Sequence, residues 1–98
     1  MKINKKQDGS ALVIALEGRL DTTTAPELEQ ELKNSLDGVT DLTLDLAKLD
    51  YISSAGLRVL LSAHKTMMKQ GQMNVTNASE IVREVFDVTC FSDILNIE

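Results

Sequence analysis

The apolar residues of this 98-residue chain change their period several times, from strand-like to helix-like and back. A nearly continuous apolar run over residues 10–18 is typical of a buried strand, and we expect both faces of that strand to be covered. Leu42, Leu44 and Leu46 alternate with polar residues, as in a strand with one dry face. Apolar residues three or four positions apart follow each of these runs and indicate amphipathic helices. The alternation predicts an α/β fold.

Three helices are predicted from this spacing. The first starts at Thr24, where Glu27 completes a capping box and Pro26 occupies the first turn, and it ends at Gly38. The second ends at Gly71, and its apolar face consists of Leu57, Leu60, Leu61, His64 and Met68. The third spans residues 79–86, and its inward face consists of Ile81, Val82, Val85 and Phe86.

The predicted order is strand, strand, helix, strand, helix, strand, helix, and residues 94–97 add a last element of undecided type. Right-handed crossovers would join these elements into one layer. We therefore expect a single domain over residues 1–98, with a mixed sheet of about four to five strands and about three to four helices.

Composition excludes several classes of function. Ten Lys and Arg against fifteen Asp and Glu give a net charge of −5, which argues against nucleic acid as a partner. The longest apolar run, residues 11–16, is too short to insert into a membrane, and the first residues lack the apolar core of a signal peptide, so we expect a cytoplasmic protein. The single cysteine, Cys90, predicts no disulfide, and neither a metal nor a cofactor is expected.

An enzymatic site is not supported. Ser54 has the placement of a hydrolase nucleophile, but Ile52 stands where the Gly-x-Ser-x-Gly motif needs glycine. The only histidine, His64, follows ten residues later on the same predicted helix, roughly 15 Å away, and we expect it to be a half-buried structural residue. Glycine-rich phosphate loops are missing as well. The prediction is a protein without catalytic activity.

The start of the second predicted helix suits an anion. If Ser54 is the N-cap, free backbone N–H groups and the positive end of the helix dipole surround its hydroxyl. Gly56 in the first turn costs about 1 kcal/mol relative to alanine, which indicates that the backbone there stays open to something approaching. Ordinary capping explains Ser54 equally well, and Ser53 would cap as well as Ser54.

Two segments resemble a known family. LDLAKLDYISSAGLRVLL over residues 44–61 resembles the signature of the STAS domain, in particular of the small bacterial anti-sigma factor antagonists. LEGRLD over residues 16–21, with the helix start that follows, resembles the other fingerprint of that family. The chain departs from the common form in having Ser53 where Asp often stands, Ala55 for a small polar residue, and Arg58 for a glycine.

The resemblance implies a regulator. In this family an anti-sigma factor that is also a serine kinase, a histidine-kinase-like ATPase, phosphorylates a serine that corresponds to Ser54, or less readily to Ser53. The unphosphorylated form binds that kinase and frees a sigma factor, and a PP2C-type phosphatase restores it. Arg58, one turn along the helix, would pair with the phosphate. The free protein is expected to be a monomer.

The resemblance also implies a partner-binding surface, which on this chain consists of Asp21, Thr22, Thr23, Ser53, Ala55, Gly56, Arg58, Ser62 and Lys65. An ordinary solvated helix face explains Ser62 and Lys65 equally well. STAS domains serve also as accessory subunits of lipid-transporting ABC systems and as scaffold units of stress-signalling complexes. Both alternatives remain open from the sequence.

Overall fold

The computed structural model describes residues 1–98. The bounds of the elements are β1 Lys2–Asp8, β2 Ala11–Leu20, α1 Ala25–Ser35, β3 Asp41–Ile52, α2 Ser54–Met68, β4 Gln72–Thr76, α3 Glu80–Val88, the 3₁₀ turn Phe91–Asp93, and β5 Asn96–Ile97. The predicted order of strands and helices is confirmed. The undecided last element is a short strand preceded by a 3₁₀ turn.

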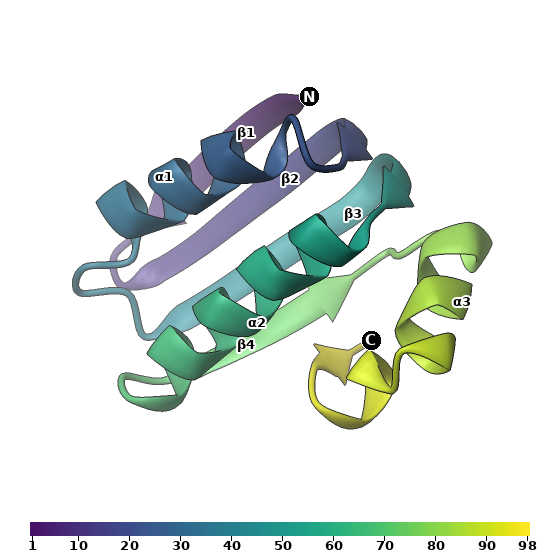
Figure 1. Ribbon diagram of the computed structural model, residues 1–98. Helices are drawn as coiled ribbons and strands as arrows, with labels where there is room; N and C mark the ends of the chain where they lie inside the picture. The colour runs from purple at the N-terminus through teal and green to yellow at the C-terminus, as the bar shows by residue number, and fades with distance from the viewer.

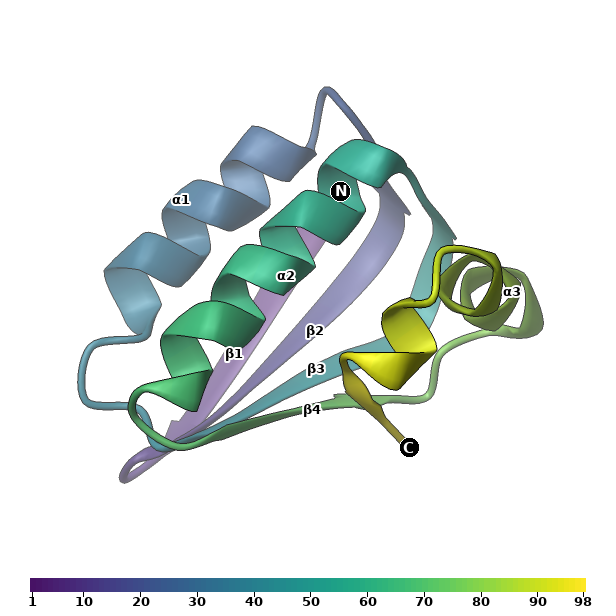
Figure 2. The same cartoon turned by 60° about the horizontal axis from the view of Figure 1, so that its bottom comes forward.

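The five strands form one mixed sheet in the order β1-β2-β3-β4-β5. β1 runs antiparallel to β2, and every other neighbouring pair is parallel. α1 links β2 to β3, α2 links β3 to β4, and the two helices lie side by side over the same face of the sheet (Figure 1 and Figure 2). The α/β class and the mixed sheet are as predicted.

Helices cover β2 on one face only, so the expectation that β2 is covered on both faces is wrong. Leu12, Ile14 and Leu16 point toward the helices and are fully buried, whereas Val13 on the other face is 37% exposed. Each new parallel strand joins the sheet at the same edge, because the strand order follows the chain order. The connections between parallel strands are right-handed as a rule. Successive helices therefore fall on the same face.

The inward face of α2 differs from the predicted one. Ala63 and Met67 belong to the buried line, while Met68 is 70% exposed. Leu61 and His64 lie at the edge of the contact and are half-buried, so the expectation for the histidine is confirmed. Met67 and Met68 are identical in chemistry, and only packing against the sheet selects one of them for the core.

α3 is capped by Ser79, whose Oγ accepts a hydrogen bond of 3.3 Å from the backbone N–H of Val82. Val82 and Phe86 are fully buried, but Ile81 is 60% exposed, so its predicted inward orientation is wrong. The helix presents a narrow line to β3 and leaves the flank that carries Ile81 in solvent. The helices contain no apolar stretch of membrane-spanning length.

Candidate functional site

Two loops meet at the carboxyl ends of β2 and β3. One follows β2 and contains Asp21, Thr22 and Thr23, and the other leads from β3 into α2. The backbone N–H of Ser53 donates a 2.9 Å hydrogen bond to the carbonyl of Leu20, which ties the two loops together. The structure thus brings both segments that carry the family resemblance to one end of the sheet.

The carboxylate of Asp21 organises the first loop. Its Oδ1 accepts a 2.7 Å hydrogen bond from the Thr23 hydroxyl and bonds of 3.0 and 3.2 Å from the backbone N–H groups of Thr23 and Thr24. Thr24 Oγ1 accepts from the backbone N–H of Asp21 and donates to the carbonyl of Arg19. Thr24 is the N-cap of α1 but makes no side-chain cap bond, so the predicted capping box is wrong.

The charge of Asp21 is stabilised by these contacts. The hydrogen bond from the Thr23 hydroxyl is the largest cause, and it lowers the pKa of Asp21. Desolvation opposes it, and the backbone N–H groups of Thr23 and Thr24 lower the pKa further, so that the pKa lies below its ordinary value. Arg19 Nε lies 3.8 Å from Asp21 Oδ2. Asp21 is therefore an ionised carboxylate at neutral pH.

The Arg19 guanidinium also stacks 4.5 Å from the ring centroid of Tyr51. Sequence reasoning missed Arg19 and Tyr51 as site residues, although both lie within the segments that carry the resemblance.

The start of α2 distinguishes the two serines that the sequence left open as caps. Ser53 is the N-cap, with extended backbone, and its Oγ accepts a 3.5 Å hydrogen bond from the backbone N–H of Gly56. The first backbone bond of the helix runs from the N–H of Leu57 to the carbonyl of Ser53. Ser54 is the first helical residue and is exposed. Ser53 is therefore the cap of the two, and the Ser54 hydroxyl is accessible.

Gly56 has a packing role. The residue is buried, and a Cβ built on it would lie 2.7 Å from Leu20 Cγ and 3.0 Å from Ile52 Cγ1. The expectation that this backbone stays open to an approaching group is wrong, because α2 itself approaches the ends of β2 and β3 at this point. The glycine allows that close approach.

A depression of about 230 Å³ lies between the first turns of α1 and α2. It brings together Thr22, Ala55 and Arg58, three of the predicted partner-binding residues. The other lining residues, which sequence reasoning missed, are Ala25, Pro26, Glu29 and Val59. The polar residues that recur at helical spacing on α1 could have indicated that Glu29 lies on the exposed side of this helix.

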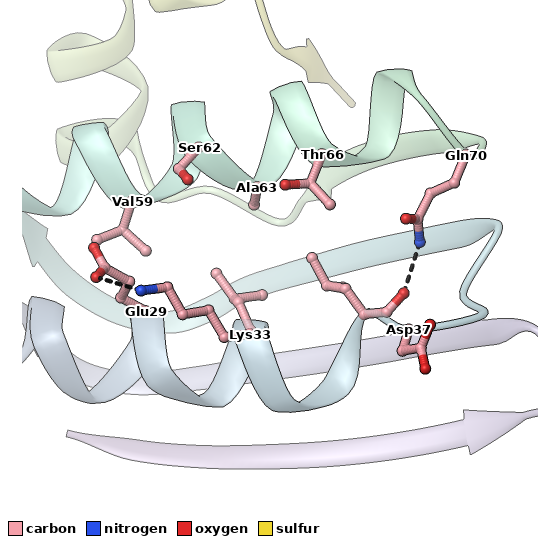
Figure 3. A pocket seen from close by; sticks show the side chains of 10 residues that line it. Glu29, Lys33, Asp37, Val59, Ser62, Ala63, Thr66 and Gln70 are labelled. Carbon is pink, nitrogen blue, oxygen red and sulfur yellow. Dashed lines mark hydrogen bonds and ion pairs between the residues drawn. The ribbon is translucent and has the colours of Figure 1, made fainter.

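A second hollow of about 320 Å³ continues along the same two helices (Figure 3). Ser62 and Thr66 of α2 face Lys33 of α1 across it, and Lys33 pairs with Glu29 at 3.5 Å. Gln70 closes one end by donating to the Leu36 carbonyl. Ser62 thus lies beside this hollow and away from the two loops.

The STAS domain family model matches residues 2–98. The chain belongs to the STAS domain family. Among curated relatives, the putative anti-sigma factor antagonist BtrV of Bordetella bronchiseptica is 37% identical, over 99% of this chain and 85% of its own length. An anti-sigma-B factor antagonist of Bacillus subtilis is 30% identical, over 99% of this chain and 90% of its own length.

Solved structures share the fold of this STAS domain. SpoIIAA of Bacillus, an anti-sigma factor antagonist, superposes in its unphosphorylated form with a TM-score of 0.86 at 19% identity, over 99% of this chain and 88% of SpoIIAA. Its phosphorylated form superposes with a TM-score of 0.77 at 18% identity, over 99% and 91%. At this identity the likeness concerns the architecture.

Two further features of the STAS domain bear on chemistry. His64 sits ten residues after Ser54 on the same helix, roughly 15 Å away at the helical rise, so the two side chains do not share a proton. No group of three or more His, Cys, Asp or Glu side chains is placed to hold a metal ion. The site offers an exposed Ser54 hydroxyl at the same end of the sheet as the ionised Asp21 carboxylate, with Arg58 one helical turn further along α2.

Proposed function

We propose that this STAS domain is an anti-sigma factor antagonist whose binding to an anti-sigma factor is switched by phosphorylation of Ser54. The observation that carries the proposal is the position of Ser54. It is the first residue of α2, its side chain is exposed, and its hydroxyl does not cap the helix. The names of the relatives from Bordetella bronchiseptica and Bacillus subtilis support the same function. The protein acts by binding, in the cytoplasm, and carries no catalytic group of its own.

The partner is a serine kinase with a histidine-kinase-like ATPase domain. In the transfer, Ser54 Oγ attacks the γ-phosphorus of ATP, and an O–P bond forms. The bond between that phosphorus and the β–γ bridging oxygen breaks, ADP leaves, and the hydroxyl proton passes to a base of the kinase. Hydrolysis of the phosphoserine by a PP2C-type phosphatase restores the serine and releases phosphate.

Charge explains how the modification weakens binding. A phosphate on Ser54 adds a charge of about −1.5 to −2 at neutral pH. The two joined loops hold that group at the same end of the sheet as Asp21, which is already ionised. A partner that buries this surface must then desolvate two anions, and repulsion between them raises the cost.

The first test maps the modified residue. The protein is incubated with the anti-sigma kinase encoded in its own genome and with ATP, and peptides are analysed by mass spectrometry. We expect one phosphate, on Ser54, and none on the Ser54→Ala variant. Because Ser53 is the cap, Ser54→Ala should melt at the wild-type temperature. Ser53→Ala is the matched control, which loses about 1 kcal/mol of stability yet is still phosphorylated.

Two outcomes contradict the proposal. Phosphate on Ser53 alone would show that the wrong hydroxyl carries the switch. No phosphate from a kinase that is active on its own substrates would refute the switch and favour a STAS subunit that works without modification.

The second test measures the effect of charge alone. Ser54→Asp places a carboxylate in the first turn of α2, where the helix dipole favours it, so thermal stability should be kept or slightly raised. Affinity for the anti-sigma kinase should fall by roughly 1 to 3 kcal/mol, because the added anion must be desolvated. Ser92→Asp, an exposed serine in the 3₁₀ turn, is the control of equal charge. Calorimetry that finds Ser54→Asp and Ser92→Asp equally tight would mean that this surface is not regulated.

A further inference from the structure

The outward face of α2 carries positive charge only. The chain has a net charge of −5, yet no Asp or Glu occurs between Ser54 and Lys69. Arg58, Lys65 and Lys69 are exposed, and their spacing of seven and four residues places them on one side of the helix. Ser54 begins the same line, four residues before Arg58. This face is therefore a cationic line that begins at the candidate phosphorylation site.

The cations on this line are uncommitted. The ion pairs of the molecule join Lys5 to Glu31, Arg19 to Asp21, and Lys33 to Glu29. Arg58 shares a depression with Glu29 but forms no ion pair with it. The positive charge of α2 is thus available to a partner.

Two exposed cations elsewhere in the molecule have acidic residues close to them in the strand pairing or on the same helix. Lys2 lies directly opposite Glu17 in the pairing of β1 with β2. Arg83 of α3 shares its short helix with Glu80 and Glu84. Compensation of this kind is what an ordinary solvated surface shows, and α2 has no acidic residue of its own to compensate Lys65 and Lys69.

Apolar side chains accompany the cations. Met68 is 70% exposed and Leu61 is half-buried, and both lie beside the cationic line at helical spacing. We call Ser54, Arg58, Leu61, Lys65, Met68 and Lys69 together the basic strip. It extends about 22 Å along the helix, at a rise of about 1.5 Å per residue.

We propose that the basic strip docks an acidic amphipathic segment of the anti-sigma factor. Carboxylates on that segment pair with Arg58, Lys65 and Lys69, and its apolar residues cover Leu61 and Met68. Charge complementarity of this kind fixes the orientation of two partners and excludes others. The inference rests on the proposed function and names the chemistry of the partner surface.

The strip also explains why a phosphate at Ser54 is effective. Residues four apart are neighbours on a helix surface, so the phosphate lies within reach of the Arg58 guanidinium. Once paired there, Arg58 is withdrawn from the partner. Phosphorylation thus removes one cation from the basic strip and adds an anion at Ser54. This change weakens the binding of an acidic segment more than it would weaken the binding of an uncharged segment.

The experiment compares two double variants with the same change in charge. Lys65→Glu/Lys69→Glu reverses the strip, and Lys2→Glu/Lys6→Glu reverses two exposed lysines on β1. Calorimetry against the anti-sigma kinase is run in about 50 mM and about 300 mM salt, where screening differs strongly. We expect the strip variant to bind at least about tenfold more weakly and with a flatter salt dependence, and the β1 variant to stay within about threefold of wild type.

A second variant covers the possibility that two glutamates destabilise the end of α2. Lys65→Gln/Lys69→Gln removes the charge without opposing the helix dipole, and it should show an intermediate loss of affinity with wild-type circular dichroism. Equal affinity of this variant, the strip variant and wild type would overturn the docking surface. If Ser54→Asp still abolished binding in that case, the proposed function would stand without it. If Ser54→Asp also bound normally, both would fail.

A membrane is the competing occupant for a basic helix face. Sedimentation with phosphatidylserine vesicles in about 50 mM salt tests it directly. We expect the protein to remain in the supernatant. Pelleting that Lys65→Glu/Lys69→Glu abolishes would overturn the assignment of the strip to a protein partner.

Discussion

Replacement of Gly56 by alanine tests why α2 begins with a glycine in its first turn. The new Cβ would lie 2.7 Å from Leu20 Cγ and 3.0 Å from Ile52 Cγ1, closer than carbon atoms pack. Both neighbours are almost completely buried, with exposed fractions of 0% and 1%, so neither moves outward to make room. The clash must be relieved by shifting α2 away from the sheet or by straining the rotamers of both side chains.

Two opposing terms set the magnitude for Gly56→Ala. Alanine favours the helix over glycine by about 1 kcal/mol, while overpacking a full core costs about 1 to 3 kcal/mol. The closest contact involves a branch carbon rather than a mobile end, which places the cost in the upper part of that range. We therefore expect a net destabilisation of about 1 to 2 kcal/mol, or a fall in melting temperature of about 5 to 10 °C for a domain of this size.

Urea denaturation and thermal melting measure this effect. Ser62→Ala, at an exposed position of the same helix, is the control, and its melting temperature should be unchanged or slightly raised. The folded fraction of Gly56→Ala should bind the anti-sigma kinase within about twofold of wild type, since the added methyl group points into the core. A variant as stable as wild type, or more stable, would refute the packing argument.

Two further perturbations follow from the geometry. Asp21→Asn should flatten the loss of stability at low pH: the pKa of Asp21 is lowered in the fold, so its contribution is present above 3.8, the ordinary value, and disappears as the pH falls through the folded pKa. Urea midpoints between pH 7 and pH 3 check this, and equal slopes for variant and wild type would contradict it. Gln70→Ala should cost about 1 to 2 kcal/mol, because Nε2 of Gln70 donates to the carbonyls of Leu36 at 2.6 Å and Val39 at 2.5 Å. An unchanged urea midpoint for Gln70→Ala would show that water replaces the amide without loss.

The candidate site was accessible to sequence reasoning only in part. The segments around Asp21 and Ser54 stand out because their residues match a family fingerprint. The roles of single side chains did not follow, since Ser53 and Ser54 are equivalent as caps until the backbone geometry distinguishes them. The hydrogen bonds of Asp21 and the stacking of Arg19 on Tyr51 depend on loop conformation and on neighbouring strands, and neither leaves a periodic pattern.

The hydrophobic period of the chain was enough to predict the order and type of every element except the last, because this period is a local property. Leu42, Leu44 and Leu46 alternate wherever their strand lies, and the glycines that follow the first two helices act on adjacent residues. Three outcomes could not be read from the sequence: one face of the sheet stays open at Val13, Met67 rather than Met68 enters the core, and Gly56 serves packing. These outcomes depend on contacts between residues that are distant in the chain. The contacts in turn follow from the right-handed crossovers and from the close approach of α2 to the sheet.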